Sequence, residues 1–358
     1  MGERVAVALS GGVDSAVAAL LLQEQGHDVI AVTMRLWQEE TYTPGEDAPG
    51  DDPTQGARQV AQALDVPFHV VDAVAPFKCQ VVDRFVHEYS VGRTPNPCLY
   101  CNRHIKFGLL LQEALALGAS SLATGHYVRR QRSADGKTWQ LLKGLDARKD
   151  QSYFLYSLDQ EALSRARFPL GDWTKDRVRA LARESGLPAA DTEESQDLCF
   201  VRDDDYRRFL RQHAPEVFQP GPILDLDGHA IGQHRGLVEY TVGQRSGIGI
   251  SAPEALYVLR LDAAQNALIV GPKRALGNNR LRADHVHWIS GQPPPEPVQA
   301  AVKIRYRARL ARATVTPLPG DRAQVTFDQP LRDITPGQGA VFYQGESVLG
   351  GGLISSKQ

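Results

Sequence analysis

The sequence has no net positive charge and no long apolar run, and each absence excludes a class of protein. Its 358 residues carry a formal net charge of −2 at pH 7, so a nucleic-acid partner would have to meet a local positive patch. No apolar run approaches the roughly 18 residues that span a bilayer, and the opening MGERVAVALSGG lacks a cationic region followed by a cleavable apolar stretch. We therefore expect a cytoplasmic protein that enters no membrane.

Cysteine is scarce, with only four residues: Cys79, Cys98, Cys101 and Cys199. In a reducing compartment, a close pair such as Cys98 and Cys101 is more typical of catalysis or metal binding than of a structural disulfide. Cys79 lies within a helical pattern, and we predict that it is buried and inert.

The amino-terminal half alternates between strand-like and helix-like segments. Apolar or extended runs at 5–9, 29–36, 68–71 and 121–125 are separated by helical patterns at 16–25, 57–64, 77–89 and 107–117. This alternation predicts an α/β domain with a doubly wound parallel sheet. The acidic stretch 39–53, rich in proline and glycine, predicts a surface loop.

Beyond residue 205 the pattern changes to short alternating runs broken by turn signals such as Asp-Gly. These runs predict two small β-rich units behind the α/β domain. The length, together with 42% hydrophobic residues, is enough for two or three folded domains. We predict domain spans of 1–205, 206–275 and 276–358.

The segment SGGVDS, from Ser10 to Ser15, lies between the first strand and the first helix. Paired glycines let the backbone approach a ligand closely, and the start of a helix offers unpaired N–H groups, so the segment predicts an anion site. It lacks both the third glycine of the dinucleotide fingerprint and the lysine of the P-loop. Asp14 is placed to cap the helix or to help hold a cation. An ordinary strand–turn–helix corner, the alternative, would not need serine on both sides.

A second motif, GRTPNPCLYCNRHIKF, places Cys98 and Cys101 just before a helix. The helix dipole there is expected to lower the thiol pKa. With Cys199, which follows the acidic stretch EESQD, the pattern suggests that one cysteine carries a transferable sulfur and another resolves the disulfide left behind. Two alternatives stay open: an iron–sulfur cluster on Cys98, Cys101 and Cys199, and a structural zinc ion, which needs four good ligands.

The carboxyl-terminal unit contains VKIRYRARLAR, in which Lys303, Arg305, Arg307 and Arg309 recur at every second position. On a strand they would share one face, which suits phosphate tracking along RNA, while Tyr306 would pack on the other face. A solvated edge strand protected by charge is the alternative. His126, at a predicted strand end, and His104 are further candidate site residues.

These motifs carry a resemblance. SGGVDS resembles the signature of the ATP pyrophosphatase superfamily, whose members cleave ATP between the α and β phosphates to adenylate a substrate. SGGVDS, TPNP with the following cysteines, ATGHY, KDQSYFL, ESQDLCF and KIRYR together resemble the tRNA 2-thiouridylase family over nearly the entire chain. The resemblance implies an adenine nucleotide α-hydrolase-like domain, a final β-barrel, and ATP-dependent thiolation of the tRNA wobble uridine at its second carbon, with release of AMP and pyrophosphate.

The resemblance also implies residue roles. Cys101 would be the nucleophile, Cys199 would carry the persulfide, and Cys98 stands where many members have Asp, which leaves its role open. ATP contacts would come from Ala8, Leu9, Ser10, Gly11, Gly12, Val13, Asp14, Ser15, Met34 and Gly125. Contacts to tRNA would come from Asn96, Pro97, Cys98, Lys149, Asp150, Gln151, Arg305 and Tyr306.

The implied ligands are ATP with Mg²⁺ and either a persulfide or an iron–sulfur cluster. The implied partners are tRNAs for Lys, Glu and Gln, and a cysteine desulfurase or sulfur-carrier protein. An adenylating ligase for a small metabolite would explain SGGVDS but not the spaced thiols. A non-enzymatic RNA-binding or metal-binding module would leave the anion site without a use.

Overall fold

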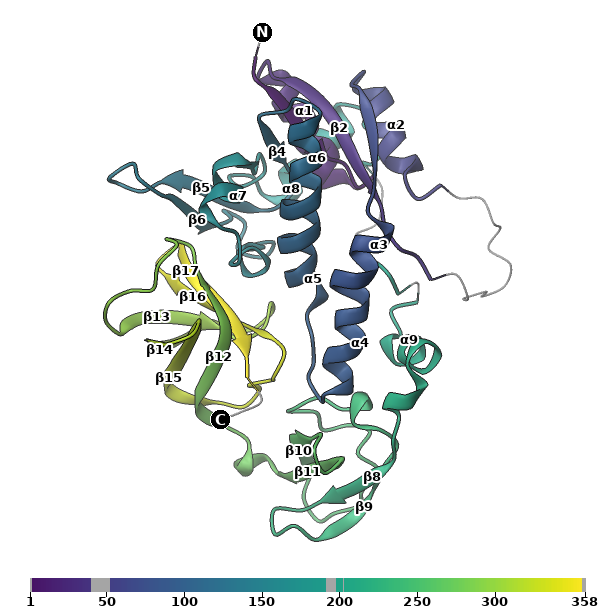
Figure 1. Ribbon diagram of the computed structural model, residues 1–358, viewed down its shortest axis with the longest axis vertical. Helices are drawn as coiled ribbons and strands as arrows, with labels where there is room; N and C mark the ends of the chain where they lie inside the picture. The colour runs from purple at the N-terminus through teal and green to yellow at the C-terminus, as the bar shows by residue number, and fades with distance from the viewer. Residues whose placement is uncertain (1, 40–51, 191–197, 202, 356–358) are drawn as a thin grey trace.

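The computed structural model describes residues 2–39, 52–190, 198–201 and 203–355, which form three units (Figure 1). The predicted surface loop 39–53 therefore lies largely outside the described residues. None of the described helices combines the length and the apolar character that a membrane span requires. We keep 1–205, 206–275 and 276–358 as proposed domain spans.

The first unit is built on a five-stranded parallel sheet in the order β3-β2-β1-β4-β7, which confirms the predicted α/β class. Strand β1 is central, and its Val5 pairs with Val29 on one side and with Ser121 on the other. Val5, Ala6 and Val7 are fully buried, which is why the short apolar run forms a central strand. The strands are β1 (Arg4–Ala8), β2 (Asp28–Arg35), β3 (Phe68–Asp72), β4 (Ser121–Ala123) and β7 (Ala166–Arg167).

Helices cover both faces of this sheet. Val5 and Val7 pack with helices α1 (Val13–Glu24), α2 (Gln55–Ala63) and α8 (Lys175–Glu184), whereas Ala6 packs with the helices that follow residue 97. Two helical columns run from the sheet toward the far end of the molecule (Figure 1). One column is α3 (Val74–Phe77), the π-helix η1 (Lys78–Val82) and α4 (Asp83–Ser90); the other is α5 (Pro97–Tyr100), the π-helix η2 (Cys101–Leu110) and α6 (Leu111–Ala116).

The second unit is a four-stranded sheet in the order β10-β11-β8-β9 at the far end of the columns (Figure 1). Helix α9 (Tyr206–His213), which the sequence analysis did not predict, joins it to the helical columns by burying Phe209 and Leu210 against Phe85 and Phe200. The strands are β8 (Gly221–Leu224), β9 (Ala230–His234), β10 (Leu256–Asp262) and β11 (Ala267–Pro272).

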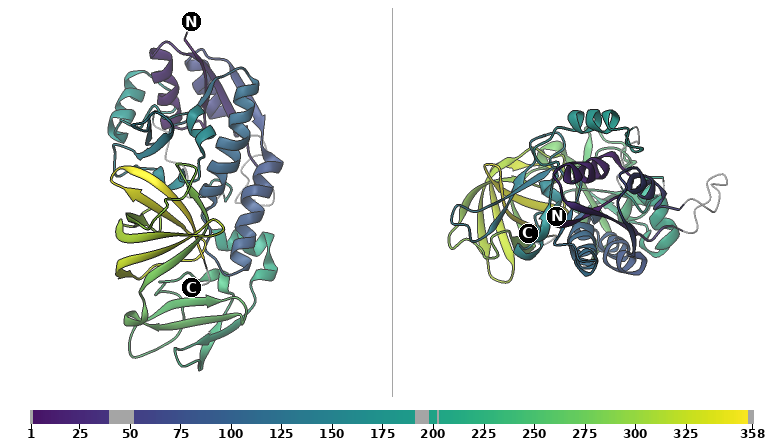
Figure 2. Two further views of the ribbon diagram at one scale, coloured as in Figure 1. Left: turned by 60° about the vertical axis from the view of Figure 1, so that its left-hand side comes forward. Right: turned by 90° about the horizontal axis from the view of Figure 1, so that it is seen from above.

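The third unit is a six-stranded barrel, closed by pairing of β12 with both β15 and β17. A hairpin of the first unit extends its wall, because Leu141 of β6 pairs with Val348 of β17. The barrel lies beside the helical columns (Figure 2). Its strands are β12 (Asn278–Trp288), β13 (Val298–Lys303), β14 (Ala311–Leu318), β15 (Arg322–Leu331), β16 (Gly339–Gln344) and β17 (Ser347–Ile354); the hairpin is β5 (Val128–Arg132) and β6 (Trp139–Lys143).

The barrel and the first unit share one apolar core. Val341, Tyr343 and Val348 of the barrel belong to the same buried cluster as Leu122 of β4 and Leu155. Short elements complete the joint, namely η3 (Ser152–Phe154) and α7 (Gln160–Arg165); the remaining short turns are η4 (Pro215–Val217), η5 (Leu237–Glu239) and η6 (Lys273–Ala275). The barrel is therefore docked through buried contacts rather than tethered.

The joint predicts a stability effect at Tyr153. Its buried hydroxyl donates to the Gly339 carbonyl and accepts from the Gly339 N–H, both at 3.1 Å. In Tyr153→Phe both backbone groups lose their partner, so we expect a destabilisation of about 1–3 kcal/mol, measured as a lower midpoint of urea unfolding. Tyr257→Phe is the matched control, because Tyr257 is half-buried and its hydroxyl has no partner among the described residues. Equal midpoints for the two variants would contradict the assignment.

Candidate active site

The segment Ser10–Ser15 forms a turn that ends β1 and starts α1. Gly11 has a φ of +80°, a conformation that favours glycine, and a Cβ there would make tight contacts of 3.2 Å with the backbone of Gly56 and Ala57. The Ser15 hydroxyl donates to the Gly12 carbonyl at 3.0 Å and accepts from the Ser10 N–H at 3.2 Å. The turn is thus held by its own serines, which leaves the first N–H groups of α1 for a ligand.

Asp14 does not cap α1, because Gly12 occupies the N-cap position without a side-chain bond. Its carboxylate instead accepts from the Lys175 ammonium, at 2.7 Å to each oxygen, and from the Tyr127 hydroxyl at 2.7 Å. The cation beside Asp14 is therefore a lysine of the protein. Lys175 is buried at the first position of α8, where the Thr174 side chain caps the helix.

A cavity of about 620 Å³ opens in front of this turn. Three segments line it together with Tyr127 and Lys175: the turn itself, residues 147–151, and Lys303 with residues 306–308 of the barrel. The predicted residues Ser10, Gly12, Val13, Asp14, Lys149, Asp150, Gln151 and Tyr306 all lie in this lining. The structure therefore brings predicted ATP and tRNA residues to one cavity.

Other residues assigned to ATP do not line the cavity. Ala8 ends β1, beside Val32 of β2, and Leu9 is buried behind the turn. Met34 is half-buried on β2. A Cβ at Gly125 would lie 2.8 Å from the Asp14 and Ser15 backbone, so only glycine permits this approach.

Asp150 and Gln151 hold their own loop in shape. The buried Asp150 carboxylate accepts from the N–H groups of Gly144 and Ser152, both at 3.1 Å, and from the Ser152 hydroxyl at 3.0 Å. The Gln151 side-chain oxygen accepts from the Tyr127 N–H at 2.9 Å. Their side chains therefore position the neighbouring Lys149 at the cavity.

The prediction that residues 303–309 form a strand is wrong. Strand β13 ends at Lys303, and a turn follows in which the Ala308 N–H donates to the Arg305 carbonyl at 3.1 Å. Arg305 points away from the cavity, donating to the Val242 carbonyl at 3.2 Å and to the Thr335 hydroxyl. Tyr306 packs on the ring of Phe154, with centroids 4.4 Å apart. The alternating charges predicted a strand. The chain turns instead because Arg305 is anchored between Val242 of the central unit and Thr335 of the barrel.

The three candidate thiols share one electrostatic environment. Cys98 lies in α5, where its N–H donates to the Asn96 side chain at 3.2 Å next to Pro97, and Cys101 begins η2. A charge on Cys98 or Cys199 raises the pKa of Cys101, so these sulfurs lie near one another. Lys106, which sequence reasoning did not single out, lowers the pKa of both Cys101 and Cys199, and in a π-helix it lies about one turn after Cys101.

The prediction that the helix dipole gives a low thiol pKa is wrong. Burial raises the pKa of Cys101 to about 12 and that of Cys199 to about 11, more than Lys106 lowers either. Cys199 keeps some exposed surface as a residue, but desolvation dominates at its thiol. Cys79 is exposed on η1, so the prediction that it is buried is also wrong.

His126 links the two sites. It is buried, its Nδ1 lies 2.8 Å from the Thr124 hydroxyl, and burial first and Lys106 second hold its pKa well below the usual range. It is therefore neutral at pH 7. The neighbouring Gly125 lies against the backbone of Asp14 and Ser15, and the Tyr127 hydroxyl donates to Asp14. The His126 ring lies 6.2 Å from the ring of Phe107 in η2, the helix that begins at Cys101, so the segment 125–127 lies between the turn and η2. His104 is half-buried, and desolvation lowers its pKa.

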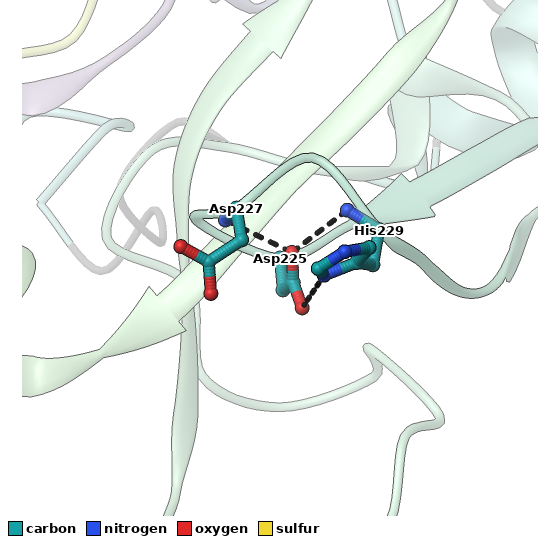
Figure 3. A group of neighbouring side chains, drawn as sticks. All are labelled: Asp225, Asp227 and His229. Atoms are coloured by element: carbon teal, nitrogen blue, oxygen red, sulfur yellow. Dashed lines mark hydrogen bonds and ion pairs between the residues drawn. The ribbon is translucent and has the colours of Figure 1, made fainter.

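Among the described residues, only Asp225, Asp227 and His229 bring three metal-type ligand atoms within 4.8 Å of one another. The Asp225 carboxylate already accepts from the N–H groups of Asp227 and His229, at 3.0 and 2.8 Å, so it serves its own β-turn (Figure 3). The three thiols do not form such a group. Because a zinc ion holds its sulfur ligands about 4 Å apart, the three thiols are not arranged for zinc. The cysteine sulfurs that bind an iron–sulfur cluster lie farther apart.

Residues 3–203 match the family model "tRNA methyl transferase HUP domain", residues 207–272 "tRNA methyl transferase PRC-barrel domain", and residues 278–354 "Aminomethyltransferase beta-barrel domain". The chain is 50% identical to tRNA-specific 2-thiouridylase MnmA of Magnetococcus marinus, covering 98% of this chain and 99% of that protein. It is 48% identical to the MnmA of Geotalea uraniireducens, covering 98% and 95%. This chain belongs to the tRNA-specific 2-thiouridylase family.

The chain also shows a distant likeness to a solved structure described as a 4-thiouridine synthetase–RNA complex with bound ATP. The identity is 18% and the TM-score 0.38, covering 60% of this chain and 51% of that one.

The thiol environment of this 2-thiouridylase family member predicts its reactivity toward iodoacetamide. At pH 7, a thiol with a pKa of about 12 is ionised in roughly one molecule in a hundred thousand, so Cys101 should be alkylated slowly. Because the thiolate reacts, its rate should rise about tenfold per pH unit. Peptide mass spectrometry measures this, with exposed Cys79 as the internal reference. A Cys101 rate that levels off below pH 9 would contradict the prediction.

Proposed function

We propose that this chain is a cytoplasmic, ATP-dependent tRNA 2-thiouridylase. The observation that carries the proposal is the position of the segment 125–127. Gly125 and Tyr127 contact the turn Ser10–Ser15, which we name the phosphate turn, and His126 lies beside Phe107 of η2, the helix that begins at Cys101. Family membership supports the reaction and its substrate class. The proposed substrates are ATP and tRNAs for Lys, Glu and Gln, with a cysteine desulfurase or a sulfur-carrier protein as donor.

In the first step, the turn and the start of α1 bind the phosphates of ATP. The wobble uridine oxygen attacks the α-phosphorus, the bond to the β-phosphate breaks, and pyrophosphate leaves. Uridine oxygen is thereby converted into part of a good leaving group. Mg²⁺ would accompany ATP; because Asp14 and Asp150 are already bonded within the protein, phosphate oxygens would supply most of its ligands.

In the second step, the terminal sulfur of a Cys199 persulfide attacks the adenylated carbon, and the carbon–oxygen bond breaks to release AMP. Cys101, which burial keeps protonated in the resting site, then loses its proton to solvent and its sulfur attacks the Cys199 sulfur. The transferred sulfur keeps the electron pair of the broken S–S bond as the thiocarbonyl. A Cys101–Cys199 disulfide remains, which a thiol reductant must reduce. Asn96, Pro97 and Cys98 would lie against the base, and Lys149 and Tyr306 toward the RNA.

This relay requires two of the three thiols, whereas an iron–sulfur cluster would require Cys98, Cys101 and Cys199. In the cluster alternative, sulfide on an open iron would supply the sulfur. The mutual influence of the three thiols fits either alternative, so the role of Cys98 distinguishes them.

The decisive experiment is nucleoside mass spectrometry on unmodified tRNA incubated anaerobically with protein, ATP, magnesium and a sulfur source. Wild type should form 2-thiouridine, and Cys101→Ser and Cys199→Ser should each lose about a hundredfold or more of the rate, because each removes a reacting sulfur. Cys79→Ser, at an exposed thiol outside the site, is the matched control and should keep full activity.

Cys98→Ser separates the two mechanisms. The relay predicts that this variant stays active and that wild type holds no iron. Iron and sulfide in wild type, lost together with activity in Cys98→Ser, would establish the cluster. If wild type formed no 2-thiouridine with a competent desulfurase present, the proposed function would be wrong.

A further inference from the structure

Among the described residues, more cations than carboxylates line the cavity in front of the phosphate turn. The basic side chains are Arg148, Lys149, Lys175, Lys303 and Arg307, against the carboxylates of Asp14 and Asp150; Arg148 is itself paired with Asp146 and Asp176. Asp14 is already bonded to Lys175, and Asp150 accepts from backbone N–H groups and Ser152. A cavity with this charge balance favours an anionic ligand.

Two of these cations come from the barrel rather than from the unit that carries the phosphate turn. Lys303 is the last residue of β13, and Arg307 lies in the turn that follows. The turn is held in place on both sides: Arg305 donates to the Val242 carbonyl, and Tyr306 packs on Phe154. Lys303 and Arg307 are therefore presented to the cavity by a fixed support.

The position of the barrel itself is fixed close to this point. Val348 of β17 pairs with Leu141 of β6, and the Lys143 ammonium and N–H donate to the carbonyls of Gly345 and Glu346, both at 2.9 Å. The turn after β13 is therefore supported by strands that are paired directly with the first unit. Charged groups on such a rigid support lose little conformational entropy when a ligand binds.

The environment of Lys303 also fits an anion. Burial lowers the pKa of Lys303, and the nearby Asp150 opposes this effect only in part. Burial therefore destabilises the charged ammonium of Lys303 by more than Asp150 stabilises it, and a bound phosphate would offset the difference.

We propose that the barrel completes the ATP site: Lys303 and Arg307 bind the β- and γ-phosphates of ATP, and then pyrophosphate, across the cavity from Ser10–Ser15. This inference rests on the proposed function for the identity of the anion. Phosphates seated at the N-terminus of α1 lie in the cavity that both barrel residues line, which favours ATP over an RNA phosphate as their ligand. Full affinity for ATP then requires a docked barrel.

The test is calorimetric binding of inorganic pyrophosphate, a non-hydrolysable ATP analogue and AMP to the full chain without tRNA. Lys303→Met and Arg307→Met should each weaken pyrophosphate and analogue binding by about tenfold or more, the effect of one charged hydrogen bond. AMP binding should not change, because AMP lacks both phosphates. Lys303→Arg should retain most of the affinity. Arg309→Met is the matched control, since Arg309 is an exposed cation of the same loop that does not line the cavity.

Wild-type pyrophosphate affinity in a Lys303→Met/Arg307→Met double variant whose thermal unfolding matches wild type would overturn the proposal. If the double variant lost affinity for tRNA alone, the ligand would be an RNA phosphate and the proposal would again be wrong. Because no arm needs thiolation, the two claims separate: loss of pyrophosphate binding in the variants supports the inference even if wild type forms no 2-thiouridine.

Discussion

An ion pair between Asp14 and Lys175 joins the start of α1 to the start of α8, segments 161 residues apart in the chain. The Lys175 side chain is 5% exposed and that of Asp14 34%, and Tyr127 completes the shell of the carboxylate. Removing one partner of a buried pair typically costs about 3–5 kcal/mol, and the partial exposure of Asp14 points to the lower end. The pair therefore fixes the phosphate turn and, through Tyr127, the segment that separates it from the thiols.

The thiol site depends in a similar way on the two carboxyl-terminal units. The Thr94 N–H donates to the Pro336 carbonyl at 2.9 Å, and the Gln338 side chain donates to the Thr94 carbonyl at 2.8 Å. The Thr94 hydroxyl lies 3.4 Å from that of Thr241 in the central unit. These bonds hold the segment just before Cys98, so a shift of the barrel or of the central unit would be transmitted directly to α5. The position of the thiol segment therefore depends on the docking of both carboxyl-terminal units.

Local patterns in the sequence were sufficient to predict the parallel sheet and the tight turn between β1 and α1. The runs at 5–9 and 29–36 form β1 and β2, because a strand that is buried on both faces consists mostly of consecutive apolar residues. Lys175 could not be predicted, because no local signal connects it to Asp14; only the fold does. The pairing of β6 with β17 of the barrel likewise has no local signal in the sequence.

The errors have a common physical cause. A helix dipole suggested a low pKa at Cys101, but burial, which depends on tertiary packing, has the larger effect. Cys79 follows a helical period, yet its face of η1 is exposed. The alternation at Lys303 to Arg309 is compatible with a strand, and only the anchoring of Arg305 between two units shows why it turns. Each error concerns a property set by residues distant in sequence.

The central claim is that ATP activates the uridine oxygen that sulfur replaces. It is tested most directly with tRNA whose wobble uridine carries a heavy oxygen isotope at its second carbon. Mass spectrometry of the AMP formed with the full chain, ATP and a sulfur donor follows that oxygen. The account predicts one heavy oxygen in AMP for each 2-thiouridine formed. Unlabelled AMP accompanying 2-thiouridine would show that sulfur enters without adenylation of that oxygen, and would contradict the account.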